Sequence, residues 1–209
     1  ETSTVERLVS ELPYELTNAQ KQVWNEILSD FQGEKVMSRL IQGDVGSGKT
    51  LVAAALFYAI SKNGGQCAFM APTEILANQH FKTLKNFFGN EFNIELLTGS
   101  TTAKNKRLVK EKLESGECQI VVGTHAMIQS DVIFKNLGLV VTDEQHRFGV
   151  KQRSTIASKS QNPDVIAMSA TPIPRTLALI LYGDLDISII DELPPNRKKI
   201  ETFAVRKNM

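Results

Sequence analysis

One segment of the chain has the residue types and spacing of a phosphate-binding loop. Residues 43–50 read Gly-Asp-Val-Gly-Ser-Gly-Lys-Thr and fit the pattern G-x-x-x-x-G-K-[ST] between an apolar run and a helical stretch. Glycines let backbone N–H groups turn inward around phosphate oxygens, at conformations that a side chain would block. The lysine adds a point charge for the β- and γ-phosphates, and the threonine hydroxyl is a ligand for Mg²⁺. A flexible glycine turn is the alternative, and the flanking elements favour the loop. We therefore expect Mg-ATP to contact Gly43, Asp44, Val45, Gly46, Ser47, Gly48, Lys49 and Thr50.

Two acidic residues follow a second apolar run. Asp143 and Glu144 come directly after residues 139–142, Leu-Val-Val-Thr. Asp143 is expected to hold Mg²⁺ together with Thr50, and Glu144 to orient and deprotonate the water that attacks the γ-phosphate. Taken alone, such a pair is more often a solvated turn, but the upstream loop favours the chemical role. The predicted catalytic residues are therefore Lys49, Asp143 and Glu144.

The elements that must position these groups follow from the hydrophobic pattern. Short apolar runs predict strands, and longer stretches between them predict helices, as in βαβ units. Right-handed crossovers then give an α/β fold with a doubly wound, mainly parallel sheet, helices on both faces and the ligand at the carboxyl ends of the strands. The predicted strands are 39–42, 67–71, 94–98, 119–123, 139–142, 165–169 and 187–190, and the predicted helices are 20–30, 49–63, 74–88, 103–115 and 174–182.

The composition is that of an ordinary globular domain. Of 209 residues, 42% are hydrophobic and 22% charged, and the net charge is +1, so any polyanion site must be a local patch. Neither a membrane-length apolar run nor a signal-peptide core is apparent, which predicts a cytoplasmic protein with no membrane partner. Cys67 and Cys118 lie in apolar surroundings, so we expect both to be reduced core thiols rather than a disulfide.

Further motifs follow in an order that resembles the first motor domain of a superfamily-two helicase. They are Thr-Asn-Ala-Gln at 17–20, Ala-Pro-Thr-Glu-Ile-Leu-Ala-Asn-Gln at 71–79, Thr-Gly-Ser at 98–100, Gly-Thr-His at 123–125, Asp-Glu-Gln-His at 143–146 and Ser-Ala-Thr at 169–171. Their ordered occurrence is far more specific than any single tripeptide. The resemblance implies a RecA-like P-loop NTPase fold and ATP hydrolysis coupled to movement along DNA.

Within that superfamily the chain resembles the RecG family of branched-DNA translocases, which remodel stalled replication forks. Segments 43–50, 143–150, 170–178, 181–186 and 190–195 carry this resemblance. The transcription-repair coupling translocases share much of the pattern and remain the alternative. Gln145 stands where those relatives usually have a second acid, which favours the RecG family.

The resemblance also implies roles for single residues. Gln20 is expected to bind the adenine edge and Tyr14 to stack on the base, although Gln20 could instead be a helix-surface amide. Ser169 and Thr171, with His146 as partner, resemble the element that couples hydrolysis to strand movement. Residues expected to line the path of a DNA strand, unless they are ordinary cap or turn residues, are Thr73, Gln79, Gly99, Thr124 and His125.

Two basic features remain open. One predicted helix carries a basic stretch that could bind phosphate, made of Lys104, Lys106, Arg107, Lys110 and Lys112. Glu111 and Glu114 interrupt it and favour a solvated helix face with charge pairs. Arg175 lies between Pro172 and Pro174, which restrict its backbone, so it is either a DNA or interdomain contact or part of a salt bridge.

We expect three parts in the chain: a leader or end of an upstream linker at 1–12, the ATP-binding domain at 13–193, and the start of a linker at 194–209. Helicases of this type need a second motor domain, whose arginine reaches the γ-phosphate, and a DNA-recognition domain. We therefore expect these domains as partners in a full-length bacterial protein associated with the nucleoid. The 209 residues alone are expected to bind ATP or ADP weakly and to hydrolyse ATP slowly at best.

Two other classes of function stay as alternatives. A P-loop kinase or transporter ATPase would need an acceptor-binding lid or an L-S-G-G-Q signature, and the sequence has neither. A nucleotide-binding interaction module without motor activity would explain a single motor half.

Overall fold

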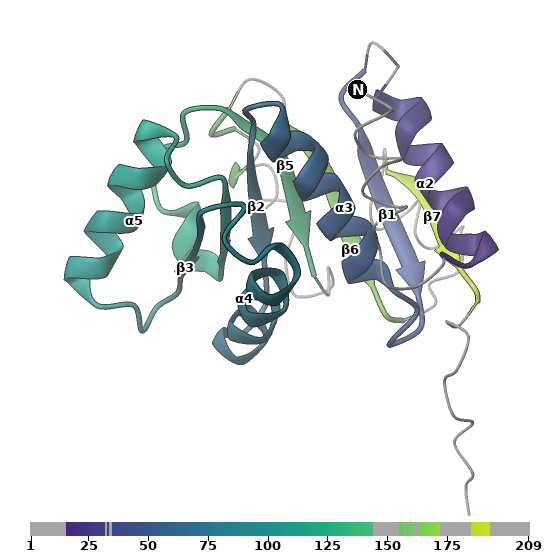
Figure 1. Cartoon of the computed structure of the whole chain (residues 1–209), viewed down its shortest axis with the longest axis horizontal. Coiled ribbons are helices and arrows are strands. Elements are labelled where there is room, and N and C mark those ends of the chain that lie inside the picture. The colour runs from purple at the N-terminus through teal and green to yellow at the C-terminus, as the bar shows by residue number, and fades with distance from the viewer. Residues whose placement is uncertain are drawn as a thin grey trace, which may run out of the picture.

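The computed structural model describes residues 16–31, 33, 35–143, 155–156, 158–160, 163–171 and 185–192. Its strands are β1 (Ser38–Gly43), β2 (Gln66–Met70), β3 (Ile94–Leu97), β4 (Ile120–Gly123), β5 (Leu137–Thr142), β6 (Asp164–Ser169) and β7 (Asp186–Ile190). They form one sheet in the order β3-β4-β2-β5-β6-β1-β7, in which every described pair is parallel (Figure 1). The predicted parallel α/β sheet is confirmed, and each predicted strand is correct to within two residues.

Helices alternate with these strands. They are α2 (Asn18–Phe31), α3 (Lys49–Lys62), α4 (Glu74–Phe88) and α5 (Ala103–Ser115), each within two residues of its predicted range. The 3₁₀ helix η1 (His125–Ile128) was not predicted, because one short turn is too brief to show a helical period. The predicted helix at 174–182 lies outside the described residues.

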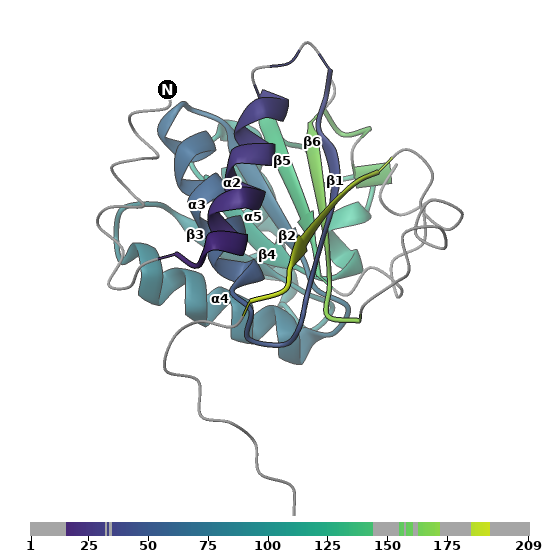
Figure 2. The same ribbon diagram turned by 90° about the vertical axis from the view of Figure 1, so that its right-hand side faces the viewer.

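Both faces of the sheet are buried, which explains why its strands read as continuous apolar runs. Along β2, Cys67 and Phe69 face a core cluster that includes residues of α2, α3 and α4. The alternating residues Ala68 and Met70 face a second cluster that includes Val109 of α5. Figure 2 shows the twist of the sheet, with α2 lying alongside it. Strands of this kind place their carboxyl ends at one edge.

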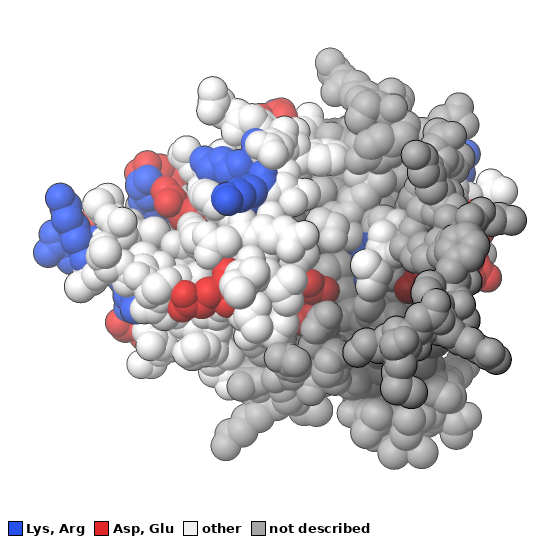
Figure 3. All heavy atoms as spheres, turned by 90° about the horizontal axis from the view of Figure 1, so that it is seen from below, with Lys and Arg blue, Asp and Glu red and all other residues white. Residues whose placement is uncertain are grey.

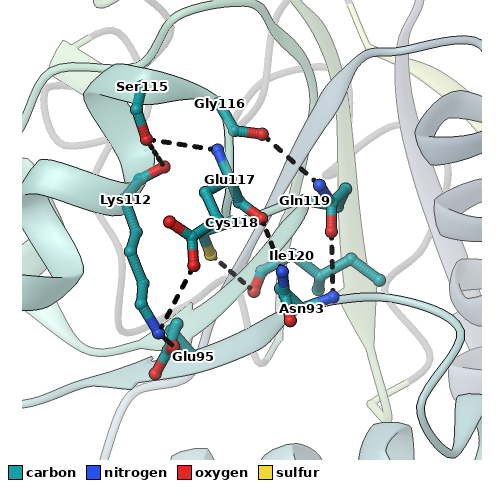
Figure 4. A network of polar contacts seen from close by, with 9 residues as sticks. All are labelled: Asn93, Glu95, Lys112, Ser115, Gly116, Glu117, Cys118, Gln119 and Ile120. Carbon is teal, nitrogen blue, oxygen red and sulfur yellow. Dashed lines mark hydrogen bonds and ion pairs between the residues drawn. The ribbon is translucent and has the colours of Figure 1, made fainter.

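The basic face of α5 is largely engaged in contacts within the chain. Lys112 Nζ lies 2.6 Å from Glu95 Oε1 on β3, and this hydrogen bond raises the pKa of Lys112 (Figure 4). Arg107 pairs with Glu111 one helical turn away at 3.6 Å, and Lys110 pairs with Asp131. These contacts agree with the interpretation of α5 as a charge-paired surface helix. Such exposed pairs contribute about 0–1 kcal/mol each.

Cys67 and Cys118 are both buried and free, as predicted. Burial raises the pKa of the Cys118 thiol to about 12, so it stays protonated at neutral pH. None of the described helices combines the length and apolar character needed to cross a bilayer.

Candidate functional site

The glycine-rich loop connects β1 to α3 at the carboxyl edge of the sheet, where β1, β2 and β5 point in Figure 1. The loop turns tightly, because Ser47 N donates to Asp44 O at 3.1 Å. Gly46 and Gly48 take positive φ angles of 80° and 93°. Gly48 is the N-cap of α3, so the first N–H groups of that helix face the loop. A helix start of this kind attracts anions through its free N–H groups and its dipole.

Glycine is required at two positions of this loop, because other atoms of the protein lie close to the backbone there. A Cβ on Gly43 would come within 2.5 Å of Ser47 Oγ and 2.9 Å of Ile190 O on β7. A Cβ on Gly48 would come within 2.1 Å of Gln20 Nε2. Neither position can therefore carry a side chain, because the protein's own atoms fill the space next to the backbone. A backbone left bare in this way can turn its N–H groups toward the phosphate oxygens that the sequence motif predicts.

Lys49 begins α3 and points back over the loop. Its Nζ donates to Gly43 O at 2.6 Å and to Asp44 O at 2.9 Å. Burial lowers the pKa of Lys49, while the carboxylates of Asp143 and Asp44 act in the opposite direction. An ammonium group has three hydrogens, so Lys49 can donate to a phosphate oxygen as well. Thr50, the predicted Mg²⁺ ligand, is half-buried in the next position.

Gln20 lies against the same loop from α2. Its Nε2 donates to Ser47 O at 2.7 Å, and its Oε1 accepts from Thr17 N at 2.9 Å. Gln20 is 3% exposed, so the helix-surface alternative is wrong. The amide has a second N–H and a second acceptor lone pair, which match the donor and acceptor pattern of an adenine edge.

The orientation of Gln20 is set by hydrogen bonds with Thr17, three residues earlier in the chain. Thr17 Oγ1 accepts from Gln20 N at 3.2 Å while Gln20 Oε1 accepts from Thr17 N, which is the reciprocal capping box of a T-x-x-Q pattern. Glu192, after β7, also accepts from Ala19 N at 3.1 Å and holds the start of α2. The capping pattern was readable from spacing, whereas the Glu192 contact depends on tertiary structure.

Asp143 follows β5 at the same edge. Its N donates to Met70 O at 2.9 Å, and its Oδ2 lies 2.7 Å from His80 Nε2 on α4. Burial lowers the pKa of Lys49, and the charge of the Asp143 carboxylate acts against this effect. No sequence motif pointed to His80, because its contact with Asp143 spans 63 positions.

Most of the residues predicted to contact DNA, or to couple hydrolysis to strand movement, also lie near this edge. Thr73 caps α4 by accepting from Leu76 N at 3.3 Å, so its cap role is real, and Gln79 is exposed on the same helix. Ser169 Oγ, at the end of β6, lies 3.1 Å from Thr171 Oγ1. Thr124 is buried, and its hydroxyl is without a hydrogen-bond partner among the described residues. His125 is exposed at the start of η1.

The Thr-Gly-Ser loop after β3 is held in place by α4. Ser100 N and Ser100 Oγ donate to the Glu74 carboxylate at 2.9 Å and 2.6 Å, and these bonds lower the pKa of Glu74. Gly99 O accepts from Lys106 Nζ at 2.8 Å. In Figure 3, which views the molecule from below, charged side chains of both signs are interspersed with uncharged surface over the described part. Tyr14, Glu144, His146 and Arg175 lie outside the described residues, so their roles stay predictions.

Comparison with known proteins gives the following similarities. The sequence pattern of the DEAD/DEAH box helicases matches residues 17–180. The chain is 53% identical over 198 residues to an ATP-dependent DNA helicase RecG of Staphylococcus epidermidis, covering 95% of this chain and 29% of that protein. It is 51% identical over 206 residues to the corresponding helicase of Thermotoga maritima, covering 98% of this chain and 26% of that protein.

Solved structures agree with these matches. A structure of RecG bound to a three-way DNA junction superposes with a TM-score of 0.82 at 47% identity, covering 96% of this chain and 27% of that one. The UvsW helicase of bacteriophage T4, at 21% identity and a TM-score of 0.64, shares the fold and covers 92% of this chain and 68% of that one. The chain thus spans less than a third of the length of these RecG proteins.

Proposed function

This chain belongs to the DEAD/DEAH box helicase family, and from that premise we propose that it is the ATP-binding motor domain of an ATP-dependent DNA helicase or translocase acting on branched DNA. The observation that carries the nucleotide part of the proposal is the joint position of Gln20, the glycine-rich loop and Asp143. Gln20 donates to Ser47 O of the loop, and Asp143 follows β5 at the same carboxyl edge of the sheet at which the loop follows β1. This arrangement supports the proposal that base, phosphate and metal are bound at this one edge of the sheet.

Each group then has a distinct task. Gln20 binds the adenine edge, the loop N–H groups and Lys49 hold the phosphates, and Thr50 and Asp143 hold Mg²⁺. Bound Mg²⁺ supplies charge that stabilises the phosphate oxygens during transfer. Glu144, directly after Asp143 in sequence, orients the attacking water and accepts its proton. Hydrolysis then depends on positioning and on charge stabilisation.

The choice of branched DNA rests on relatives. The matched proteins are ATP-dependent DNA helicases, and one matched structure holds a three-way DNA junction. This chain contributes Thr73, Gln79 and the loop at Gly99, whose hydroxyl, amide and backbone groups suit phosphate contacts that carry no sequence information. Its second motor domain and its DNA-recognition domain are proposed partners within the full-length protein.

The proposal is tested by ATP hydrolysis of the full-length natural protein with a panel of nucleic acids. We expect forked and three-way DNA to stimulate hydrolysis more than duplex or single-stranded DNA of equal length, and RNA to stimulate it least. The stimulation should weaken as salt rises, because phosphate contacts release counterions. A preference for RNA would remove the DNA assignment while leaving the nucleotide site intact.

Replacement Gln20→Ala is expected to reduce the preference for ATP over GTP by about 5-fold to 30-fold, since the one or two hydrogen bonds lost from the adenine edge cost about 1 kcal/mol each. The measurement is competition of ATP and GTP against a fluorescent nucleotide. Gln22→Ala is the matched control, because Gln22 lies on the same helix with its amide directed to Glu26.

A second variant separates adenine recognition from helix capping. Gln20→Glu keeps an acceptor for Thr17 N but cannot donate to Ser47 O or to the base. We expect it to lose the ATP preference although the cap is kept, and to melt somewhat below the unmutated protein, because a carboxylate oxygen then faces Ser47 O in a buried position. An unchanged ATP to GTP ratio in both Gln20 variants would contradict the assigned role.

A further inference from the structure

His80 is joined to the predicted metal ligand by a short hydrogen bond. Its Nε2 lies 2.7 Å from Asp143 Oδ2, and the two side chains are 12% and 16% exposed. The imidazole also packs on Phe69 of β2, with ring centroids 4.3 Å apart and planes inclined by 37°. The ring is therefore restrained both by its polar contact and by its packing.

The chemistry of this bond sets its direction. An ionised carboxylate can only accept hydrogen bonds, so Nε2 of His80 carries a hydrogen and donates it to Asp143. A donor fixed at one carboxylate oxygen defines the plane in which the other oxygen points. Residues that bind a metal ligand in this way orient it, and their loss typically weakens metal binding or activity about 10–100-fold.

The helix that carries His80 is firmly seated. Ala77 and Leu84, on either side of His80 along α4, are fully buried in the core cluster. Thr73 caps the first turn of the helix. α4 also carries Gln79, one of the residues proposed to contact DNA. The bond from His80 thus runs from a rigid element on the proposed DNA path to the proposed metal site.

We propose that His80 is a positioning residue: it orients the Asp143 carboxylate for Mg²⁺ and links α4 to the metal site. This inference rests on the proposed function, since it takes Asp143 as the Mg²⁺ ligand. His80 itself contacts neither the nucleotide nor the metal in this role. Its effect is on the geometry and affinity of the metal site.

Three replacements of His80 test this role, because their side chains differ in length and in whether they carry a hydrogen-bond donor. The longer amide of His80→Gln can place a donor at nearly the same distance as Nε2, whereas the amide of His80→Asn is one methylene too short, and His80→Leu has no donor. The probe is Mg²⁺, titrated against binding of a fluorescent ATP analogue by the full-length protein. We expect His80→Asn and His80→Leu to need about 10-fold more Mg²⁺ for half-maximal binding, and His80→Gln to stay within about 3-fold.

The control is Thr83→Ala, an exposed residue on the same helix whose hydroxyl donates to Gln79 O at 3.0 Å. It should leave the Mg²⁺ dependence unchanged. Melting temperatures of all variants are measured in parallel. Equal Mg²⁺ dependence of the glutamine and asparagine variants, both folded, would overturn the positioning role.

The outcome also separates this inference from the proposed function. Absence of Mg²⁺-dependent nucleotide binding in the unmutated protein would count against the proposed site itself. Normal binding in the unmutated protein, combined with unaltered Mg²⁺ titrations in the His80 variants, would reject only the inference. Binding measured without turnover keeps the readout independent of the second motor domain.

Discussion

Replacement Lys49→Ala is expected to lower ATP hydrolysis by the full-length protein by about 10²–10³-fold, to the level of an unstimulated background. Lys49 lies at the start of α3, and its ammonium group already spans the loop by donating to Gly43 O and Asp44 O. It supplies the positive charge next to the phosphates. Alanine removes that charge and both loop contacts together.

The effect is measured as the DNA-stimulated rate of phosphate release at saturating ATP. Lys62→Ala is a suitable control, because Lys62 lies in the last turn of the same helix and pairs with Glu91 at 2.6 Å on the surface. It should hydrolyse ATP at the unmutated rate. Substantial ATP hydrolysis by folded Lys49→Ala protein would contradict the assignment of the loop as a nucleotide site.

Replacement Gly48→Ala should weaken ATP binding on the order of 100-fold, or about 2.7 kcal/mol. Two effects combine there. The φ of 93° strains any residue with a Cβ, at about 1–2 kcal/mol, and the new methyl group would lie 2.1 Å from Gln20 Nε2. Gln20 must then leave its contacts with Thr17 and Ser47, so adenine recognition is lost together with the loop conformation.

Gly64→Ala separates the two effects. Gly64 has a comparable φ of 79°, but a Cβ there meets nothing within 4 Å. Both variants should lose about 1–2 kcal/mol of unfolding free energy from backbone strain, and only Gly48→Ala should lose ATP affinity. Titration with a fluorescent ATP analogue, beside denaturant unfolding, measures the two quantities. Equal ATP affinity in both variants would show that Gln20 and the loop are not coupled as described.

Much of the fold could be predicted because its signals are local. Strands covered on both faces must be apolar throughout, so β2 and β5 stood out from the polar stretches around them. Helices α4 and α5 are capped by Thr73 and Thr102, whose hydroxyls accept from N–H groups of the first turn, and threonine is a common N-cap. The turn η1 escaped prediction because four residues carry too little pattern.

The candidate site likewise has parts that local sequence patterns predict and parts that only the tertiary structure shows. The glycine-rich loop was readable because its residues are consecutive and each has a role that few other residue types can fill. Only the resemblance predicts the role of Gln20, whereas the T-x-x-Q spacing of Thr17 and Gln20 already contains the capping box that orients it. The contacts of Glu192 with Ala19 and of His80 with Asp143 join residues far apart in sequence, so no local pattern predicts them.

The sequence by itself determined the chemistry that the loop and Asp143 can perform, because consecutive residue types decide which groups a strand delivers to its carboxyl end. The tertiary structure decided how those groups are held. Parallel pairing of β1 with β6 and of β6 with β5 brings the ends of β1 and β5 to one edge. Packing of α4 on the sheet then places His80 against Asp143. The order of residues along the chain does not specify this contact, because it depends on how α4 packs against the sheet.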